Sequence, residues 1–538
     1  MSRPPLLLLL TLVLVTLAAW PGSPARANEV FGLSLEELLA PQALPETVGF
    51  RRDPALRVSE MIALQDRLNA LRVESATRRA FRVELTDVER QRIDVDGSAE
   101  RRYLVGVARA AGLDVALDTA RVTSAAGNAV QVGPGAARGI GNRDLVWTSV
   151  FEAPGAAAMR LSLSGLDLPK GAELYVYNLA GQAFGPYVGR GPLGDGDLYT
   201  HTVFGDRLYL QLQITDGADA TVRFRVEEVG VMGQRFLPAR FGPALTTFDG
   251  LATEASNLCS YNADCIVNAA CQSSNVVNGA KDAVATMLFR SGGSYYICTG
   301  GLIADTDNST VVPYFLTANH CIGSGREASS LETFFDYQTT CANPNCTQPY
   351  NNNGDTVGAT LLNASSSDDH SLLRLSSAPV TADGVATYLG WTSSAVANTN
   401  GTQLYRISHP SGAPQAYSEQ RVDTTKGTCT QLPRGRFIYS TDTVGATEGG
   451  SSGSPVINGA GQIVGQLYGA CGTNLNDVCD SASNATVDGA FANAYSSLQA
   501  YLNSTGGGSC SPTGASCTLN SDCCSNSCKG RSGNKTCK

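Results

Sequence analysis

Cysteine is missing from the first 258 of the 538 residues. Ten of the sixteen cysteines lie between Cys259 and Cys479, and six lie between Cys510 and Cys537. The N-terminal half therefore has neither disulfides nor a thiol nucleophile, whereas the rest fits an oxidising compartment, where disulfides persist. The uneven distribution predicts a cysteine-free N-terminal region, a bridged central domain and a small tail stabilised by disulfides.

Long apolar runs are also missing after the first twenty residues. Residues 6–19 are predominantly apolar, follow a positively charged start and precede a small-residue motif that ends at Ala27. This pattern predicts a secretory signal peptide over residues 1–27, because the apolar segment is shorter than the roughly 20 residues that span a bilayer. We therefore expect a secreted (extracellular) protein without a membrane span.

Basic residues form no long cluster. The net charge is −9, and six of the 39 basic residues are lysines. Because nucleic-acid binding relies on basic patches, nucleic acid is not an expected partner. The sequence also contains no motif that indicates a metal or another cofactor.

The N-terminal region shows two patterns. Residues 28–115 are rich in Arg and Glu, and the apolar residues of 59–74 recur at three- and four-residue steps, which predicts amphipathic helix. From about Leu145, apolar and polar residues alternate, which predicts a small antiparallel β-sandwich. The alternating segments are residues 158–166, 173–179, 207–214 and 221–229. With His201 as its only histidine, this region is expected to serve the domain that follows rather than to carry chemistry.

Histidine is scarce as well, with four in the chain. The stretch GGSSGSPV (449–456) is either a small-residue turn or the site of a nucleophile, Ser452. A serine nucleophile needs a histidine base that is itself held by a carboxylate. His320 is the best candidate, because it ends the strand-like run 314–321 and precedes Cys321, which we expect to form a disulfide with Cys298. His370 and His409 lie in polar sequence that is typical of loops.

The carboxylate is expected in DDHSLLRL (368–375). Asp369 precedes the apolar residues of a predicted buried strand, so it would lie at the edge of a barrel and point inward. There it could fix the imidazole tautomer and stabilise the imidazolium. Its neighbour Asp368 is expected to be solvated.

These three segments, LTANHC, DHSLLRL and GSSGSP in that order, resemble the chymotrypsin-like serine endopeptidases, and most closely the secreted bacterial lysyl endopeptidases. The resemblance covers about residues 257–500. It implies a mainly β fold with a chymotrypsin-like double β-barrel, and peptide-bond hydrolysis through an acyl-enzyme. Ser452 would be the nucleophile, His320 the base and Asp369 the residue that orients His320. The backbone N–H groups of Gly450 and Ser452 would form the oxyanion hole.

The chain departs from this pattern at the positions that set specificity. Ser451 and Ala446 stand where animal trypsins have aspartates, and Thr486 aligns with the specificity aspartate of lysyl endopeptidases. Asp488 and Asp480 are the nearby alternatives for binding a basic P1 side chain, Lys or Arg. By the same resemblance, Tyr468, Gly469 and Ala470 would pair with the substrate backbone, and Cys259 would bond Cys471.

The expected domains are a signal peptide (1–27), a helical and β-sandwich propeptide (28–250), the protease domain (251–503), a flexible linker (504–509) and a disulfide-rich tail (510–538). The tail resembles cystine-knot peptides, which implies the pairs Cys510–Cys524, Cys517–Cys528 and Cys523–Cys537. Its basic residues suggest an anionic or cell-surface ligand. We expect a monomer that cleaves proteins or peptides; the alternative is a catalytically silent, protease-like adhesin.

The lysine distribution bears on maturation. No lysine lies between Lys170 and Lys281, whereas Arg235 and Arg240 lie in the interval 230–258, where the propeptide junction is expected. A strictly lysine-specific enzyme could not cut itself after a preferred residue in this interval. If maturation is autocatalytic, we therefore expect an enzyme that is not strictly lysyl.

Overall fold

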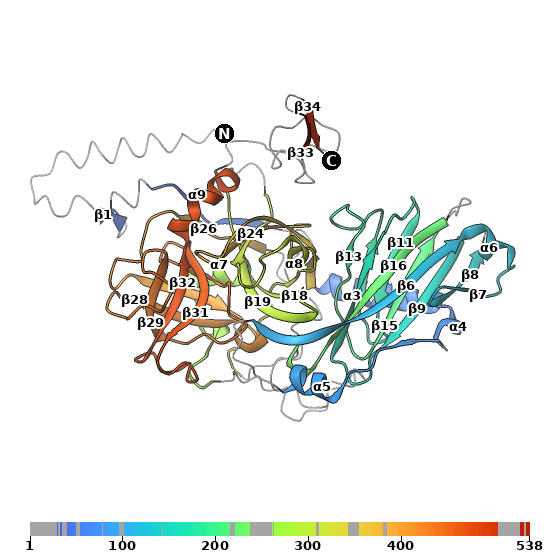
Figure 1. Cartoon of the computed structure of the whole chain (residues 1–538), viewed down its shortest axis with the longest axis horizontal. Coiled ribbons are helices and arrows are strands. Elements are labelled where there is room, and N and C mark those ends of the chain that lie inside the picture. Colours follow the sequence, from blue (N-terminus) through green and yellow to red (C-terminus); the bar gives the residue numbers. More distant parts are fainter. Residues whose placement is uncertain are drawn as a thin grey trace, which may run out of the picture.

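We analysed a computed structural model of the chain. It describes residues 29–30, 33–34, 40–49, 54–77, 79–95, 102–141, 144–215, 221–236, 261, 263–307, 311–342, 354–379, 385–503, 528–531 and 534–537. Two β-rich bodies lie side by side (Figure 1). The N-terminal body is drawn in blue to green, and the C-terminal body in yellow-green to red. The expected mainly β fold is thereby confirmed.

The N-terminal body is a sandwich of two antiparallel sheets. One sheet contains β6 (Tyr103–Asp118), β10 (Ala158–Ser164), β13 (Leu198–Tyr199), β14 (Val203–Phe204) and β16 (Thr221–Met232). The other contains β7 (Val130–Val132), β8 (Gly135–Gly141), β9 (Asp144–Glu152), β11 (Ala172–Tyr177), β12 (Ala183–Tyr187) and β15 (Arg207–Ile214), with β5 (Phe81–Arg82) parallel to β9. Alternating apolar side chains such as Leu161, Val226, Leu210 and Leu212 fill the space between them, as the period-two pattern predicts.

Helices cover the margins of the sandwich. The predicted amphipathic helix is α3 (Pro54–Leu71), whose Leu68 is buried in an aromatic cluster with Tyr177 and Tyr209. Shorter helices are α4 (Glu74–Thr77), α5 (Asp87–Asp94) and α6 (Thr119–Ser124). The expectation of helix as far as residue 115 was wrong, because β6 begins at Tyr103. Its eleven paired positions with β16 outweigh the helix propensity of its Ala- and Arg-containing sequence.

The C-terminal body holds the two barrels. The first contains β18 (Val284–Ser291), β19 (Ser294–Leu302), β20 (Tyr314–Ala318), β21 (Glu332–Phe334), β22 (Gly354–Val357), β23 (Ala359–Ser365) and β24 (His370–Leu375). The second contains β26 (Gly390–Thr392), β27 (Gln403–Ser408), β28 (Ala416–Val422), β29 (Phe437–Val444), β30 (Pro455–Ile457), β31 (Gln462–Gly472) and β32 (Asn484–Ala490), joined by β17 (Val267–Asn268). Helices α7 (Asn275–Ala283), α8 (Gly325–Ser329) and α9 (Phe491–Leu502) complete this body.

One strand belongs to both bodies. β6 pairs with β16 on one side and with β19 on the other, so the sandwich sheet continues into the first barrel (Figure 1). The contact with β19 runs over Ser294–Ile297. Further upstream, β3 (Gln42–Ala43) pairs with β26, and β4 (Glu46–Gly49) pairs with β25 (Val385–Tyr388). The N-terminal region therefore contacts the C-terminal body through backbone pairing at separate places.

Four disulfides join described residues of the C-terminal body. The predicted pair Cys298–Cys321 is confirmed. The predicted pair Cys259–Cys471 was wrong, because Cys471 bonds Cys429, its neighbour across the base of the second barrel. The other two are Cys265–Cys479 and Cys271–Cys341.

The predicted signal peptide, the junction beyond Phe236 and the linker lie outside the described residues. Of the tail, the structure describes one hairpin, β33 (Cys528–Arg531) and β34 (Asn534–Cys537), so the expected knot is not tested. Among the described helices, none has the length and apolar character needed to cross a membrane.

Candidate active site

The site begins with two neighbouring strands of the first barrel. β20 and β24 are antiparallel, and Ala318 lies opposite His370, so the residues that follow one strand meet those that precede the other. There His320 Nδ1 lies 2.7 Å from Asp369 Oδ2, and the His320 backbone N–H donates to Asp369 Oδ1 at 2.9 Å. One carboxylate thus fixes both the ring and the backbone of the histidine.

The backbone at Asp369 is held in an unusual conformation. Its φ of +58° lies in the left-handed region, which aspartate enters more readily than most residues other than glycine. The Asp369 carbonyl accepts hydrogen bonds from the Asn319 N–H at 2.9 Å and from Gln466 Nε2 at 3.1 Å. These contacts come from both barrels, and they hold the buried carboxylate in the direction of His320.

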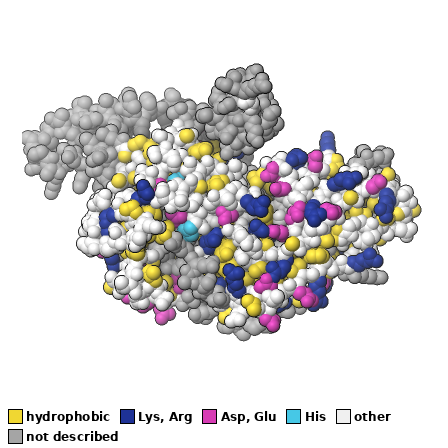
Figure 2. Space-filling view, viewed as in Figure 1, with side chains coloured by type: hydrophobic (Ala, Val, Ile, Leu, Met, Phe, Trp, Pro, Cys, Tyr) yellow, Lys and Arg dark blue, Asp and Glu magenta, His cyan; other side chains and the backbone are white. Residues whose placement is uncertain are grey.

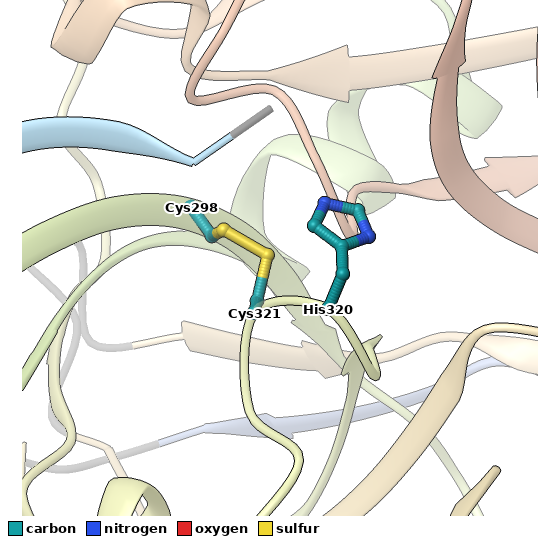
Figure 3. A group of neighbouring side chains, drawn as sticks. All are labelled: Cys298, His320 and Cys321. Carbon is teal, nitrogen blue, oxygen red and sulfur yellow. A yellow bond between two sulfur atoms is a disulfide. The ribbon is translucent and has the colours of Figure 1, made fainter. Parts of the chain in front are cut away.

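The predicted disulfide lies directly beside the histidine (Figure 3). Cys298 on β19 bonds Cys321, the residue after His320, and fastens the histidine segment to the neighbouring strand. Cys298, His320 and Cys321 form the one cluster of metal-ligand side chains among the described residues. Because both sulfurs are joined to each other, neither is a thiolate, and the cluster is not suited to binding a metal.

The segment that carries Ser452 docks onto the same strand. The backbone N–H of Thr299 donates to the Ser452 carbonyl at 2.8 Å, and the Thr299 hydroxyl donates to the Gly450 carbonyl at 2.8 Å. Cys321 Sγ lies 3.7 Å from the same Ser452 carbonyl oxygen. Ser452 and His320 are therefore anchored to one strand through consecutive residues, Cys298 and Thr299.

Two glycines make this close docking possible. Gly450 has a φ of +97°, and a Cβ there would lie 2.9 Å from the His409 carbonyl oxygen. Gly453 has a φ of +84°, and a Cβ there would lie 2.2 Å from Thr317 Oγ1. Both the left-handed backbone and the lack of space require glycine.

The second nitrogen of His320 faces different surroundings from the first. Nε2 is buried and has no hydrogen-bond partner among the residues that the structure describes. The Tyr468 ring meets the imidazole edge to face, with 5.9 Å between ring centroids. The nitrogen that a serine hydroxyl would use is thus shielded from bulk water.

Ser451 shows how the chain manages without the aspartate found in trypsins. Ser451 is fully buried, and its hydroxyl accepts a hydrogen bond from Ser408 Oγ at 3.1 Å. A neutral pair of hydroxyls therefore occupies the space next to Ser452, where trypsins place an ion pair.

Asp368 was expected to be solvated, and this was wrong. It is 3% exposed, and its Oδ1 lies 2.9 Å from His370 Nδ1. Burial alone would raise its pKa, but the hydrogen bond and charge of His370 outweigh burial and lower the pKa of Asp368 to about 2. Asn493 adds a hydrogen bond at 2.9 Å, and His370 Nε2 lies 2.8 Å from Asn363 Oδ1.

The two histidines that were assigned to loops are both buried. His370 is the first residue of β24, and His409 follows β27 with no solvent exposure. The His409 ring stacks on Tyr337, and its Nδ1 lies 3.0 Å from the Ala413 carbonyl oxygen. Burial lowers the pKa of His409 to about 4, despite that backbone contact. His409 is therefore a neutral core residue near physiological pH.

The strand expected to bind the substrate backbone lies next to the histidine. Tyr468, Gly469 and Ala470 belong to β31, and Gly469 and Ala470 pair with Val487 and Thr486 of β32. Tyr468 contacts His320 on one side and Phe437 on the other. These residues lie where the sequence placed them, and their role towards substrate stays a prediction.

Both predicted specificity carboxylates are already engaged by other residues of the protein. Asp488 is fully buried and forms an ion pair with Arg406, which is also fully buried. Gln420 Nε2 donates to the other Asp488 oxygen at 2.9 Å, so both oxygens are satisfied within the core. Asp480 accepts hydrogen bonds from the Ser483 N–H and from Asn474 Nδ2 at a surface turn.

Sequence analysis missed a third carboxylate, Asp442 on β29. The Thr486 hydroxyl lies 2.8 Å from each of its two oxygens, so the residue aligned with the family's aspartate contacts an aspartate on the next strand. The sequence did offer a signal, because a threonine and an aspartate each stand within a strand whose neighbouring core positions are apolar. The strand register needed to join them was not available from the sequence.

Comparison with known proteins supports the resemblance. Residues 254–484 match the family described as lysyl endopeptidase, C-terminal domain. The lysyl endopeptidase of Pseudomonas aeruginosa is 29% identical over 360 residues, which cover 64% of this chain and 72% of that protein. The secreted RxLR effector protein 73 of Plasmopara viticola is 31% identical over 210 residues, 38% of this chain and 48% of that protein.

Solved structures of proteases are also similar over part of the chain. The Rv3671c protease of M. tuberculosis in its active form covers 46% of this chain and 88% of its own, with 16% identity and a TM-score of 0.29. An HtrA-type protease with a tripeptide covers 43% of this chain and 63% of its own, with 16% identity and a TM-score of 0.31.

The family match spans the segments that carry His320, Asp369 and Ser452. The relative from Pseudomonas extends the similarity beyond that domain, since the aligned length exceeds the family match. The chain is therefore a serine endopeptidase that is similar to the lysyl endopeptidases over residues 254–484.

Proposed function

We propose that the protein is a secreted endopeptidase, made as a precursor, that cleaves peptide bonds with a triad of Ser452, His320 and Asp369. The observation that carries this proposal is the bond of 2.7 Å between His320 Nδ1 and Asp369 Oδ2. It sets the tautomer in which Nε2 accepts a proton. The segment that carries Ser452 is anchored to β19 next to the Cys298–Cys321 bridge, so the proposed nucleophile lies against the strand that also fixes the histidine segment.

In this mechanism Ser452 Oγ attacks the peptide carbonyl while His320 Nε2 takes the hydroxyl proton. The imidazolium is stabilised by Asp369 and then protonates the leaving amine, and water repeats the sequence to release the acyl group. The N–H groups of Gly450 and Ser452 would bind the oxyanion. In other enzymes, losing one such donor costs on the order of 3 kcal/mol in the barrier.

Labelling with a fluorophosphonate tests the nucleophile. We expect the mature protein to be labelled on Ser452, and Ser452→Ala to abolish both labelling and peptidase activity. Ser411→Ala is the matched control, because Ser411 N–H donates to the neighbouring Gly449 carbonyl but its hydroxyl bonds Glu448. A folded wild-type protein that is never labelled would favour the silent adhesin instead.

We also propose that residues 28–250 act as a propeptide that templates the protease fold. Arg160 of β10 and Glu332 of β21 are both fully buried, 3.8 Å apart, and Glu332 accepts hydrogen bonds from Thr202. Arg290 of β18 pairs with Glu228 of β16 at 2.6 Å. Because a buried charge is costly without its partner, the interface favours these two bodies folding against each other.

Refolding tests this role. Residues 251–503 alone should recover little activity after dilution from denaturant, and addition of residues 28–250 as a separate chain should restore it. The variant Arg160→Met in the added chain is expected to restore less, since it leaves Glu332 buried without its cation. Equal recovery with and without the N-terminal chain would contradict the proposal.

The position of the maturation cut bears on the P1 preference of the enzyme that makes it. Arg235 is 7% exposed and its guanidinium lies over the Tyr103 ring, 4.1 Å from the centroid, so a protease cannot reach it in the folded precursor. We therefore propose that the cut follows Arg240, inside the interval 230–258 and ahead of the boundary at 250 expected from the sequence, and that the enzyme that cuts accepts basic P1 residues. Sequencing the N-terminus of the mature form tests this, with an uncut Ser452→Ala precursor as the sign of self-cleavage.

A further inference from the structure

The two positions at which related proteases carry a specificity carboxylate are occupied by residues that cannot bind a cation. Ala446, six residues before Ser452, is 3% exposed and packs against Ile266 and Ala416. Thr486 offers only a hydroxyl, and that hydroxyl is directed to Asp442. A preference for basic substrates therefore needs a carboxylate from another place in the second barrel.

Three aspartates of this barrel differ in what already neutralises them. Asp488 has a buried arginine as its partner, and Asp480 is held in a surface turn. Asp442 forms no ion pair among the described residues, and its hydrogen-bond donor there is the neutral hydroxyl of Thr486. Asp442 is also partly exposed, whereas Asp488 is completely buried. Asp442 and Asp480 thus both keep a net charge, but Asp442 is the one that contacts Thr486, the residue aligned with the family's specificity aspartate.

The surroundings of Asp442 do not supply the missing cation. Arg406 is the nearest guanidinium, but it is engaged by Asp488 and by Gln420 Oε1. Lys426 Nζ donates to three backbone carbonyls, those of Ser481, Ala482 and Asn484. Burial raises the pKa of Asp442 to about 6, more than the Thr486 hydrogen bond and the charge of Arg406 lower it.

The strand register connects Asp442 to the triad. Thr486 of β32 lies opposite Ala470 of β31 on one side and opposite Ser440 of β29 on the other. Ala470 is two residues beyond Tyr468, which contacts His320, so it lies about 7 Å along the strand from that contact. Asp442 is two residues beyond Ser440 and shares its face of the sheet. The Thr486 hydroxyl, one strand away from Ala470, therefore holds the Asp442 carboxylate beside the strand that is expected to bind the substrate backbone.

We propose that Asp442 is the residue that binds the positively charged P1 side chain, Lys or Arg, and that Thr486 positions its carboxylate. This inference rests on the proposed peptidase function. The specificity charge has moved from β32, where the family pattern places it, to the adjacent strand β29. A basic P1 side chain supplies the cation that Asp442 lacks in the folded protein. A neutral P1 side chain leaves the Asp442 carboxylate desolvated and without an ionic partner.

The test compares matched substrates on the mature enzyme produced from the full chain. Asp442→Asn keeps the size and a hydrogen-bond acceptor for Thr486 but removes the charge. We expect kcat/KM for Lys and Arg substrates to fall by about 100-fold or more, while kcat/KM for a Leu substrate and the rate of fluorophosphonate labelling stay within about threefold. Asp480→Asn is the matched control and should leave the Lys/Leu ratio unchanged.

An exchange variant tests the geometry rather than the charge alone. Asp442→Thr combined with Thr486→Asp returns the carboxylate to β32 and should restore a large part of the basic preference. Thr486→Val should reduce the Lys/Leu ratio, and Thr486→Ser should rescue it, because serine retains the hydroxyl. A Lys/Leu ratio unaffected by Asp442→Asn would overturn the proposal.

The wild-type enzyme provides a measurement that needs no variant to fold. Inhibition by benzamidine, an amidinium compound, should weaken as pH falls through about 6, because Asp442 is then protonated, with Arg406, Asp488 and Lys426 as the charged groups around it. Active enzyme with no preference for basic residues would overturn the role of Asp442 alone. Folded protein with neither labelling nor activity would overturn the proposed function itself.

Discussion

Two consecutive aspartates of one turn each hold a histidine. Asp369 holds His320 with 2.7 Å between its Oδ2 and Nδ1, and Asp368 holds His370 with 2.9 Å between its Oδ1 and Nδ1. Their difference lies at the far side of each ring. His370 Nε2 lies 2.8 Å from Asn363 Oδ1, whereas His320 Nε2 has no partner among the described residues. A histidine held by a carboxylate is a base only where its second nitrogen is left for a substrate or nucleophile.

The largest effect should separate the two aspartates in activity. Asp369→Asn is expected to lower kcat by about 10⁴-fold, because an amide favours the wrong tautomer of His320. Asp368→Asn should lower kcat by no more than about tenfold, since it acts through the shape of the turn. Single-turnover kinetics with an activated ester measures both. Similar losses in the two variants would mean that the pairs are not functionally distinct.

Stability should rank the aspartates in the opposite order. Asp368→Ala leaves His370 and Asn493 buried without their acceptor, and we expect the free energy of unfolding to fall by about 3 kcal/mol. Asp369→Ala should cost less, because His320 lies at the edge of the site. Urea unfolding of the Ser452→Ala background, which avoids self-digestion, gives both values. A larger loss for Asp369→Ala would contradict this assignment.

Acid titration sharpens the comparison further. The pKa of Asp368 is lowered to about 2 in the folded protein, against about 3.9 in an unfolded chain. Its contribution of about 2 to 3 kcal/mol is therefore complete above pH 4 and is lost as pH falls through 2. The wild type should lose more stability than Asp368→Asn between pH 4.5 and 2. Parallel curves for the two proteins would show that Asp368 does not titrate in this way.

The smallest expected effect concerns Nε2 of His370, the atom at which the two histidine–aspartate pairs differ. Asn363→Ala removes the nearer partner of His370 Nε2 and should cost about 1 kcal/mol of stability, because the Ser497 hydroxyl at 3.4 Å remains. The change loosens His370 Nε2, yet it should not restore activity to His320→Ala, because Ser452 is anchored beside Cys321 and not beside His370. Any recovered turnover would show that an available nitrogen outweighs its placement.

The residues proposed as the triad could be selected from the sequence because each lies in a motif of local character. His320 precedes the bridged Cys321, Asp369 precedes a buried strand, and Ser452 lies between two glycines whose left-handed backbone only glycine accepts readily. The mainly β fold and the Cys298–Cys321 bridge followed from the same local patterns.

Contacts that depend on the register between distant strands could not be predicted from the sequence. The partner of Cys471 depends on how the loop between β28 and β29 folds against β31, and the burial of Asp368 depends on Asn493 of a helix 125 residues away. Asp442 was missed for the same reason, because only the pairing of β29 with β32 brings it to Thr486. The helical pattern before residue 115 was overridden by β6, whose strand form comes from two partners distant in sequence.

The sharing of β6 between the two bodies has a consequence for the mature enzyme. When residues 28–250 are removed, as we propose, the backbone of Ser294–Ile297 loses its hydrogen-bonding partner. The barrel then exposes an unsatisfied strand edge flanked by Tyr295 and Tyr296, which is a surface on which another extended chain can pair. Solubility of the released enzyme is therefore tied to this short edge, where Tyr295, which packs in one cluster with Val105 and Met232 of the sandwich, would be uncovered as well.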